Sequence, residues 1–222
     1  MKSDYKNKFG KYNGNEAEYA LRVLDSESPQ NRGYPWVTEF EDKFCELSGA
    51  KYSIAVNSAT SGLHAALVAA DVGPNDEVIQ PALTVIMNSL VTIACGATPV
   101  FVDINPDTWN IDVNSIEKKI TSKTKAIMAV SLFGLPLDIE PIMELAKKHN
   151  LIVIDDSAET ITGKHKGKFP GMHADMAVYS FENKKHMSSG SEGGMVITSN
   201  PKLAEKVRKF SGIGYKNLTA SA

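Results

Sequence analysis

The sequence predicts an α/β fold: a mainly parallel, mixed sheet with helices packed on both of its faces. Short apolar segments alternate along the chain with amphipathic segments of helical periodicity, which is the pattern of βαβ units. One apolar segment, "LIVID" at 151–155, is hydrophobic at nearly every position, as is typical of a strand buried on both faces. With 222 residues, 42% of them hydrophobic, the chain can bury the core of one large domain.

The first part of the chain, residues 1–35, is polar and punctuated by Gly and Pro. We expect it to form an N-terminal arm with one short helix at 16–24. From Val37 to Leu47 apolar residues recur at helical spacing, and Gly49 follows as a stop signal. Residues 36–222 are therefore predicted to form the main domain.

From Tyr52 onward, predicted strands and helices follow one another in regular order. Each strand is a short apolar run that ends at a turn, and each helix between them has one apolar face. The predicted strands are 52–58, 76–81, 98–104, 124–134, 151–159, 174–181 and 193–199. The predicted helices are 58–71, 85–96, 112–120, 138–150 and 201–214. This order of elements favours crossover connections and hence a mainly parallel sheet.

Composition argues against several classes of partner. The net charge is −2 and the basic residues are scattered, so we expect neither a nucleic-acid nor a membrane partner. No run approaches 18 apolar residues, and the N-terminus lacks an apolar signal segment. Cys45 and Cys95 lie in apolar patterns, and we expect buried free thiols in a reducing cytosol. The expected location is cytoplasmic.

Ligands of open α/β sheets bind at the carboxyl ends of the strands, and three predicted strand ends carry reactive or polar residues. The first is the small-residue turn Ser58–Gly62 at the start of a helix. Free backbone N–H groups and the helix dipole favour an anion there, and Thr60 and Ser61 add hydroxyl donors. An ordinary serine N-cap is the alternative explanation.

The second strand end carries Asp155 and Asp156 after a wholly apolar run. A carboxylate at that depth needs a cationic or hydrogen-bonding partner, and a protonated pyridine nitrogen is one. An N-cap or a metal ligand are alternatives. Further His or carboxylate ligands do not follow nearby, so we expect no metal site.

The third strand end is the segment "VYSFENKKHMSSGSEGGMVIT" at 178–198. Ser180 can hold a phosphate oxygen, Lys184 or Lys185 can form a Schiff base, and the glycines of 190–194 allow backbone to approach a ligand. Taken alone, the lysine pair is explained by solvation. An anion turn, a deep acid and a lysine, in that order, together suit pyridoxal phosphate, which needs its phosphate, ring nitrogen and aldehyde held.

Four ordered segments, spread from Gly33 to the end of the chain, resemble the DegT/DnrJ/EryC1/StrS aminotransferases, a family of pyridoxal-phosphate-dependent sugar aminotransferases of fold type I. The segments are "GYPWVTEFEDKFCELSGAKYSIAVNSATSGLHAAL", "PALTVIMNSLVTIACGATPVFVDI", "VIDDSAET" and "YSFENKKHMSSGSEGGMVIT". The resemblance implies the large-domain fold of that class. It also implies that the family's smaller C-terminal domain is absent from this chain, which ends at "GIGYKNLTASA".

The resemblance assigns a role to each candidate residue. Lys185, five residues after Ser180, matches the Schiff-base lysine, so Lys184 is a bystander. Asp156 would face the pyridine nitrogen and Glu159 would lie near the ring oxygen. The residues that would hold the phosphate are Ser180, Thr60 and Ser61.

Three positions depart from the family's pattern. Ala59 replaces the glycine of the usual Ser-Gly-Thr turn, a mild change if its φ stays negative. Val85 stands where an aromatic residue commonly stacks on the ring, so the contact with the cofactor ring would be aliphatic. Ser191 is inserted before "EGG".

The implied activity is transfer of an amino group, from glutamate as donor, to a keto group of a nucleotide-linked sugar, as in polysaccharide biosynthesis, by a homodimer. Some relatives have His at the lysine position and are dehydratases, so lysine here favours transamination. A dehydratase of the same family remains an alternative, as does a non-catalytic truncated fragment. A metal-dependent hydrolase that uses Asp155 and Asp156 is a third.

Overall fold

The computed structural model describes residues 12, 14–25 and 35–214. Its helices are α1 (Glu16–Asp25), α2 (Pro35–Ser48), α3 (Ala59–Ala69), α4 (Met87–Ala94), α5 (Val113–Ile116), α6 (Glu140–His149) and α7 (Pro201–Ser211), with 3-10 turns η1 (Glu117–Lys119) and η2 (Leu132–Gly134). Its strands are β1 (Tyr52–Val56), β2 (Glu77–Pro81), β3 (Thr98–Val102), β4 (Thr124–Val130), β5 (Ile152–Asp156), β6 (Met176–Ser180) and β7 (Gly194–Thr198). The predicted alternation of strands and helices is confirmed.

The seven strands form one mixed sheet in the order β1-β7-β6-β5-β4-β2-β3. The neighbouring pairs from β6 to β3 are parallel, whereas β7 is antiparallel to both β6 and β1. All strands except β7 therefore point the same way, and their carboxyl ends meet at one edge of the sheet.

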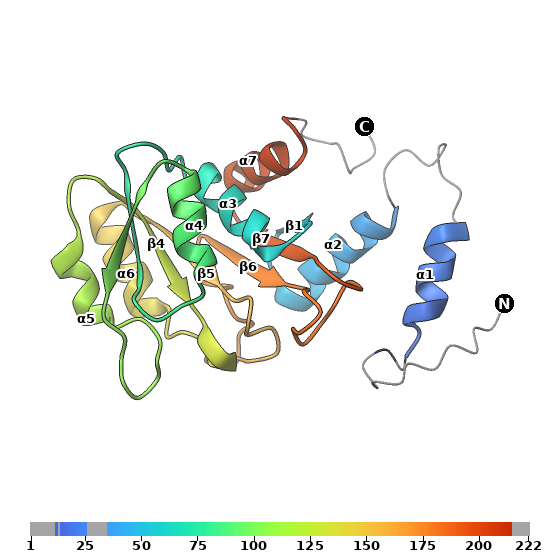
Figure 1. The fold of residues 1–222 in the computed structure, drawn as a ribbon. Helices are drawn as coiled ribbons and strands as arrows, with labels where there is room; N and C mark the ends of the chain where they lie inside the picture. The colour runs from blue at the N-terminus through green and yellow to red at the C-terminus, as the bar shows by residue number, and fades with distance from the viewer. Residues whose placement is uncertain (1–11, 13, 26–34, 215–222) are drawn as a thin grey trace.

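Helices cover both faces of the sheet, as Figure 1 shows. One hydrophobic core packs α3, α4 and α7 against Ile154, Val178 and Val196. On the opposite face, α5 and α6 pack against Val153 at one end, and α2 packs against Tyr179 at the other. In Figure 1 the helix α1 lies to the side of these layers, next to the start of α2, where Tyr19 and Trp36 make an edge-to-face contact.

Helix α3 approaches the sheet closely because of one small residue. A Cβ at Gly62 would lie 2.9 Å from Val178 Cγ1 and 3.1 Å from Val196 Cγ2. Any larger side chain would push α3, and with it the turn at its N-terminus, away from the sheet. The glycine predicted to be in a turn thus lies inside the helix and sets the distance between helix and sheet.

Three local expectations are corrected. The strand predicted to run to residue 134 ends at Val130, and Phe133 in the following turn has a φ of 53°. The helix predicted at 112–120 is a single α-helical turn followed by a 3-10 turn. Cys45 and Cys95 are free, but they are half-buried rather than buried.

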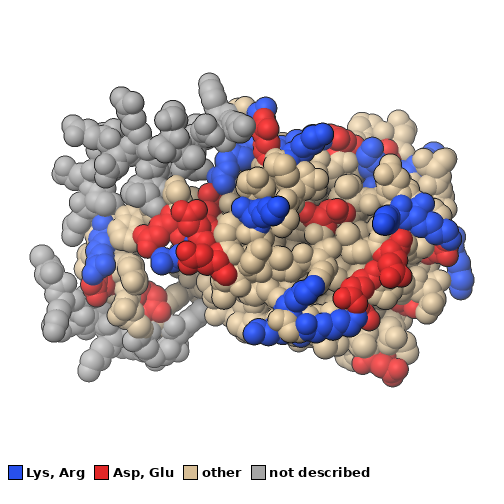
Figure 2. Space-filling view, turned by 180° about the vertical axis from the view of Figure 1, so that it is seen from behind, with Lys and Arg blue, Asp and Glu red and all other residues tan. Residues whose placement is uncertain are grey.

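Two further observations concern the helices and the charges on the surface. Within the described residues, no helix has both the length and the apolar character needed to cross a bilayer. On the face shown in Figure 2, Lys and Arg are interspersed with Asp and Glu.

Candidate active site

The three candidate strand ends lie at the same edge of the sheet. Val56 at the end of β1 pairs with Gly194, which in turn pairs with Ser180 at the end of β6. On the other side of β6, Val178 pairs with Asp156 at the end of β5. The register of three strand pairs therefore brings the anion turn, the lysine segment and the acid to neighbouring positions.

The turn after β1 is the N-terminus of α3. Ser58 is the N-cap, and its Oγ accepts a hydrogen bond from Ser61 N at 3.1 Å and lies 3.0 Å from Ser61 Oγ. The N–H groups of Ala59 and Thr60 precede it in the same turn, where the helix provides no backbone acceptor. The serine N-cap uses the N–H of Ser61, so an anion can still bind the N–H groups of Ala59 and Thr60. Ala59 is helical, so its replacement of glycine costs no backbone strain.

The start of β7 holds this turn in place through a glycine. A Cβ at Gly194 would lie 2.7 Å from Ala59 N, 2.8 Å from Ser58 C and 2.9 Å from Tyr179 O, all of them backbone atoms. These contacts leave no room for a side chain. Gly194 therefore lets the end of β6, the start of β7 and the start of α3 meet.

We expect Gly194→Ala to lower the free energy of unfolding by about 1–3 kcal/mol, the usual cost of forcing an extra carbon into a packed site. It should also weaken phosphate binding, because the start of α3 has to move. Gly73→Ala is the matched control, since a Cβ there meets nothing within 4 Å. Urea denaturation of both variants measures the difference, and equal stabilities would contradict the steric argument.

Asp156 is buried, with only 2% of its surface exposed, and its carboxylate accepts two hydrogen bonds. Asn88 Nδ2 donates to its Oδ2 at 3.0 Å, and Ala158 N donates to its Oδ1 at 3.1 Å. Burial raises the pKa of Asp156 above its ordinary value, and these hydrogen bonds, together with the positive charge of Lys185, oppose that rise. Among the described residues no ion pair to Asp156 is found. Its environment therefore suits a cation that binds later, such as a protonated ring nitrogen.

Asp155 is separated from Asp156 by the alternation of the strand. It pairs with Ala177, on the sheet face opposite to Val178, and its oxygens accept from Ser131 Oγ at 3.0 and 3.3 Å. Successive residues of a strand point to opposite faces, so the two carboxylates cannot chelate one metal ion from adjacent positions. This geometry argues against the metal-dependent hydrolase.

Burial raises the pKa of Asp155 to about 7, although the hydrogen bond from Ser131 acts in the opposite direction. The folded protein then holds a proton on Asp155 that the unfolded chain releases near the ordinary pKa of 3.8. This contribution to stability is present at low pH and is lost as pH rises through the folded pKa. We expect the free energy of unfolding of the cofactor-free protein to fall between about pH 4 and pH 7, and Asp155→Asn to reduce that fall. Urea denaturation across this range measures it, and an equal slope in the variant would contradict the assignment.

Lys185 is half-buried, whereas Lys184 is exposed. Lys185 Nζ lies 3.1 Å from Glu159 Oε1. The other oxygen of Glu159 accepts from Phe133 N at 3.2 Å, so the carboxylate is fixed at both ends. Lys185 is thus paired with Glu159, and its positive charge is close enough to Asp156 to lower the pKa of that carboxyl.

The segment between β6 and β7 forms a compact loop around Lys185. Ser180 is buried, and its Oγ accepts from Glu182 N at 3.3 Å. Tyr12 OH lies 2.9 Å from Asn183 Oδ1 and 3.0 Å from Ser188 Oγ, on the two sides of Lys185 in the chain. The arm and the lysine loop are thus in direct contact.

Ser191, which the resemblance predicts to be an insertion, is exposed in the turn of this loop. The pairing of Ser180 with Gly194 continues into a regular antiparallel ladder. Ser191 therefore lies outside the paired residues of the two strands.

Val85 and its neighbours reveal a residue that the sequence did not single out. Val85 is exposed in the turn before α4, and Thr84 Oγ1 donates to Asn88 Oδ1 at 3.0 Å. Asn88 is completely buried and contacts Asp156. Its signal in the sequence is a polar residue on the packed side of an otherwise apolar helix, which also buries Thr92 four residues later.

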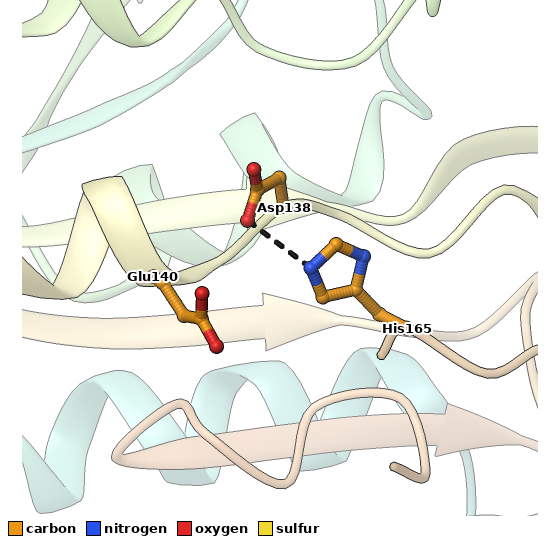
Figure 3. A group of neighbouring side chains, drawn as sticks. All are labelled: Asp138, Glu140 and His165. Carbon is orange, nitrogen blue, oxygen red and sulfur yellow. Dashed lines mark ion pairs between the residues drawn. The ribbon is translucent and has the colours of Figure 1, made fainter. Parts of the chain in front are cut away.

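A second group of potential metal ligands, Asp138, Glu140 and His165, lies in a different part of the structure and is shown in Figure 3. His165 Nε2 is 3.1 Å from Asp138 Oδ1. Lys166 Nζ contacts both Asp138, at 3.4 Å, and Glu140. Because this ammonium group already pairs with both carboxylates, the cluster is explained as an ion-pair network at the surface.

Known proteins resemble this chain over most of its length. The model of the DegT/DnrJ/EryC1/StrS aminotransferase family matches residues 11–221. A GDP-perosamine synthase of Caulobacter vibrioides is 44% identical over 201 residues, which are 90% of this chain and 54% of that protein. The chain spans about half the length of the relatives that it matches.

Two solved structures share the fold. DesI, crystallised in the presence of its TDP-sugar product, is 34% identical with a TM-score of 0.83, over 90% of this chain and 50% of that one. NtdA of Bacillus subtilis with bound PMP is 33% identical with a TM-score of 0.80, over 89% of this chain and 45% of that one. This likeness confirms the expected fold class, the large-domain fold of these enzymes.

Proposed function

The chain belongs to the DegT/DnrJ/EryC1/StrS aminotransferase family, and from that premise we propose that its protein is a pyridoxal-phosphate-dependent aminotransferase. It transfers an amino group, with glutamate as donor, to a keto group of a nucleotide-linked sugar. The observation that carries the proposal is the placement of Lys185 Nζ against Glu159, beside the buried Asp156, at one edge of the sheet.

The residues at this edge fit pyridoxal phosphate. The N-terminus of α3, with Thr60 and Ser61, offers backbone and hydroxyl donors to a phosphate group, and Ser180 adds a hydroxyl from the end of β6. Asp156 is a buried carboxylate suited to a cationic ring nitrogen. Val85, which is exposed in the turn before α4, would contact the ring through an aliphatic side chain.

When bound, pyridoxal phosphate supplies an electron sink for the electron pair left as a proton departs from the amino donor. The chain supplies the remaining functions. Lys185 Nζ would hold the cofactor covalently, and the same amine would accept and return the proton of the amino donor. Glu159, fixed by Phe133 N, keeps that amine near Asp156. Asp156 keeps its negative charge where a ring proton has to be held.

The organisation of the whole protein is also part of the proposal. Residues 1–35 are proposed to be an arm and residues 36–222 the cofactor-binding domain, in a cytoplasmic homodimer. Support for a partner subunit comes from α4 and the turn before it, where apolar side chains are exposed: Leu83, Ile86, Met87, Leu90 and Ile93. Sedimentation of the purified protein measures the oligomeric state.

The test uses the protein expressed from its complete reading frame. Incubation with pyridoxal phosphate, glutamate and a keto-sugar nucleotide should yield an amino sugar nucleotide and 2-oxoglutarate in equal amounts. Loss of a sugar hydroxyl without amine transfer would identify a dehydratase instead. Failure to take up pyridoxal phosphate at all would favour the non-catalytic alternative and contradict the proposal.

A further inference from the structure

Asn88 reaches Asp156 from a different layer of the fold. It is the second residue of α4, whereas Asp156 ends the central strand β5. Asn88 is 0% exposed, and its Nδ2 lies 3.0 Å from Asp156 Oδ2 and 3.0 Å from Met128 Sδ. A carboxylate only accepts hydrogen bonds, so the Asn88 amide must present its NH₂ group to Asp156.

The orientation of this amide is fixed at its other end. Thr84 Oγ1 donates to Asn88 Oδ1 at 3.0 Å, which leaves the NH₂ group of the amide to face Asp156. A chain of hydrogen bonds thus runs from Thr84 through Asn88 to Asp156. It joins the turn that carries Val85 to the acid at the end of β5.

The hydrogen bond from Asn88 acts on the charge of Asp156. Burial disfavours the ionised carboxylate, and Asn88 is the largest of the interactions that oppose burial. The N–H of Ala158 and the positive charge of Lys185 act in the same direction, whereas the negative charge of Glu159 acts against them. Asp155, the preceding residue, lies on the opposite face of the sheet, and the negative charge of Asp156 helps to raise its pKa.

We infer that Asn88 is a positioning residue that keeps Asp156 ionised and aimed at the ring nitrogen of pyridoxal phosphate, with Thr84 fixing its amide. This inference rests on the proposed function. Asn88 donates to one carboxylate oxygen and Ala158 N to the other, and each oxygen keeps one further acceptor site for the ring N–H. Without Asn88, the proton shared by the ring nitrogen and Asp156 should shift toward Asp156.

The test compares Asn88→Leu, which keeps the volume but removes the donor, with Thr92→Val as a control on the same buried face of α4. In the cofactor-free protein, the carboxyl carbon of Asp156 is followed by NMR with ¹³C-labelled aspartate, and Asp156→Asn identifies its signal. We expect Asn88→Leu to move the titration of Asp156 upward by about one to two pH units, the scale of one hydrogen bond to a charged group. Thr92→Val should leave it unchanged.

A second readout uses pyridoxal phosphate labelled with ¹⁵N in the ring. The ring nitrogen should be protonated in the unsubstituted protein and less so in Asn88→Leu. We expect kcat to fall about 10- to 100-fold while KM for the nucleotide sugar changes little, because the lost interaction does not touch the sugar. Thr84→Val should lower kcat and ring protonation by a smaller amount. Thr84→Ser keeps the hydroxyl, and it should give the values of the unsubstituted protein.

An unchanged Asp156 titration together with an unchanged ring ¹⁵N signal in Asn88→Leu would overturn the inference. If the unsubstituted protein took up no pyridoxal phosphate, the proposed function would fail and the part of the inference that concerns the ring would fail with it. The titration of the Asp156 carboxyl in the cofactor-free protein would still decide whether Asn88 favours its ionised form.

Discussion

Lys185→Ala is expected to abolish covalent attachment of pyridoxal phosphate, whereas Lys184→Ala is expected to retain it. Lys185 Nζ is directed to Glu159 and lies close enough to Asp156 to affect its titration, while Lys184 is exposed. The two lysines are adjacent and have the same charge, so each variant is the matched control of the other. Activity should fall about 10,000-fold in Lys185→Ala, the upper range for a positioned acid–base group.

Borohydride reduction followed by peptide mass spectrometry measures the attachment. The cofactor should be found on the peptide that contains Lys185, at that residue alone, and its absorbance band near the visible edge should be missing in Lys185→Ala. Cofactor trapped on Lys184 in that variant would show that the assignment of the two lysines is reversed.

Asp156→Asn is expected to lower kcat about 100- to 1,000-fold, the scale for removing one preorganised charged partner from an active site. The substitution keeps the shape and an acceptor oxygen for Asn88 or Ala158, but it cannot hold a ring proton by charge. The cofactor should remain attached to Lys185, because that bond is made at a different atom. Steady-state kinetics with a parallel measurement of bound cofactor separates the two effects.

Asp155→Asn serves as the comparison, since Asp155 lies on the opposite face of the sheet and bonds Ser131. It should keep most of the activity and change mainly the pH dependence of stability. Equal losses of activity in the two variants would contradict a special role of Asp156 at the ring.

Much of the fold follows from the periodicity of the sequence. The runs around 52–58, 76–81 and 151–159 became β1, β2 and β5, because short apolar runs between helical segments have few other stable places in a soluble domain. Periodicity carries no information on strand direction. The reversed direction of β7 and its insertion between β1 and β6 therefore appear only in the structure.

Local turns were harder to predict because they depend on distant partners. The strand β4 stops at Val130 since Ser131 turns to bond Asp155 and accepts from Leu137 N. Leu137 is near Ser131 in the chain, but Asp155 is 24 residues away. Phe133 then takes a positive φ, which its residue type does not predict.

The candidate site residues that follow strand ends could be predicted from the sequence, whereas Asn88 in helix α4 could not. The structure brings Lys185 into contact with Glu159, and it places Asp156, Ser180 and the start of α3 at the same edge. Asn88 was missed because its sequence neighbourhood is that of an ordinary buried helix. Only the packing of α4 over β5 shows that its amide faces Asp156.

The reversed strand β7 has a consequence for how the protein is made. β1 is an edge strand, and β7, near the other end of the described chain, is its sole neighbour in the sheet. While the ribosome is still synthesising residues before Gly194, the turn at Ser58 has no strand to hold it beside the rest of the sheet. Such long-range pairings form late and slowly during folding. A nascent chain is therefore expected to capture the cofactor only after β7 has emerged, because a strand far along the chain has to hold the turn that follows the first strand.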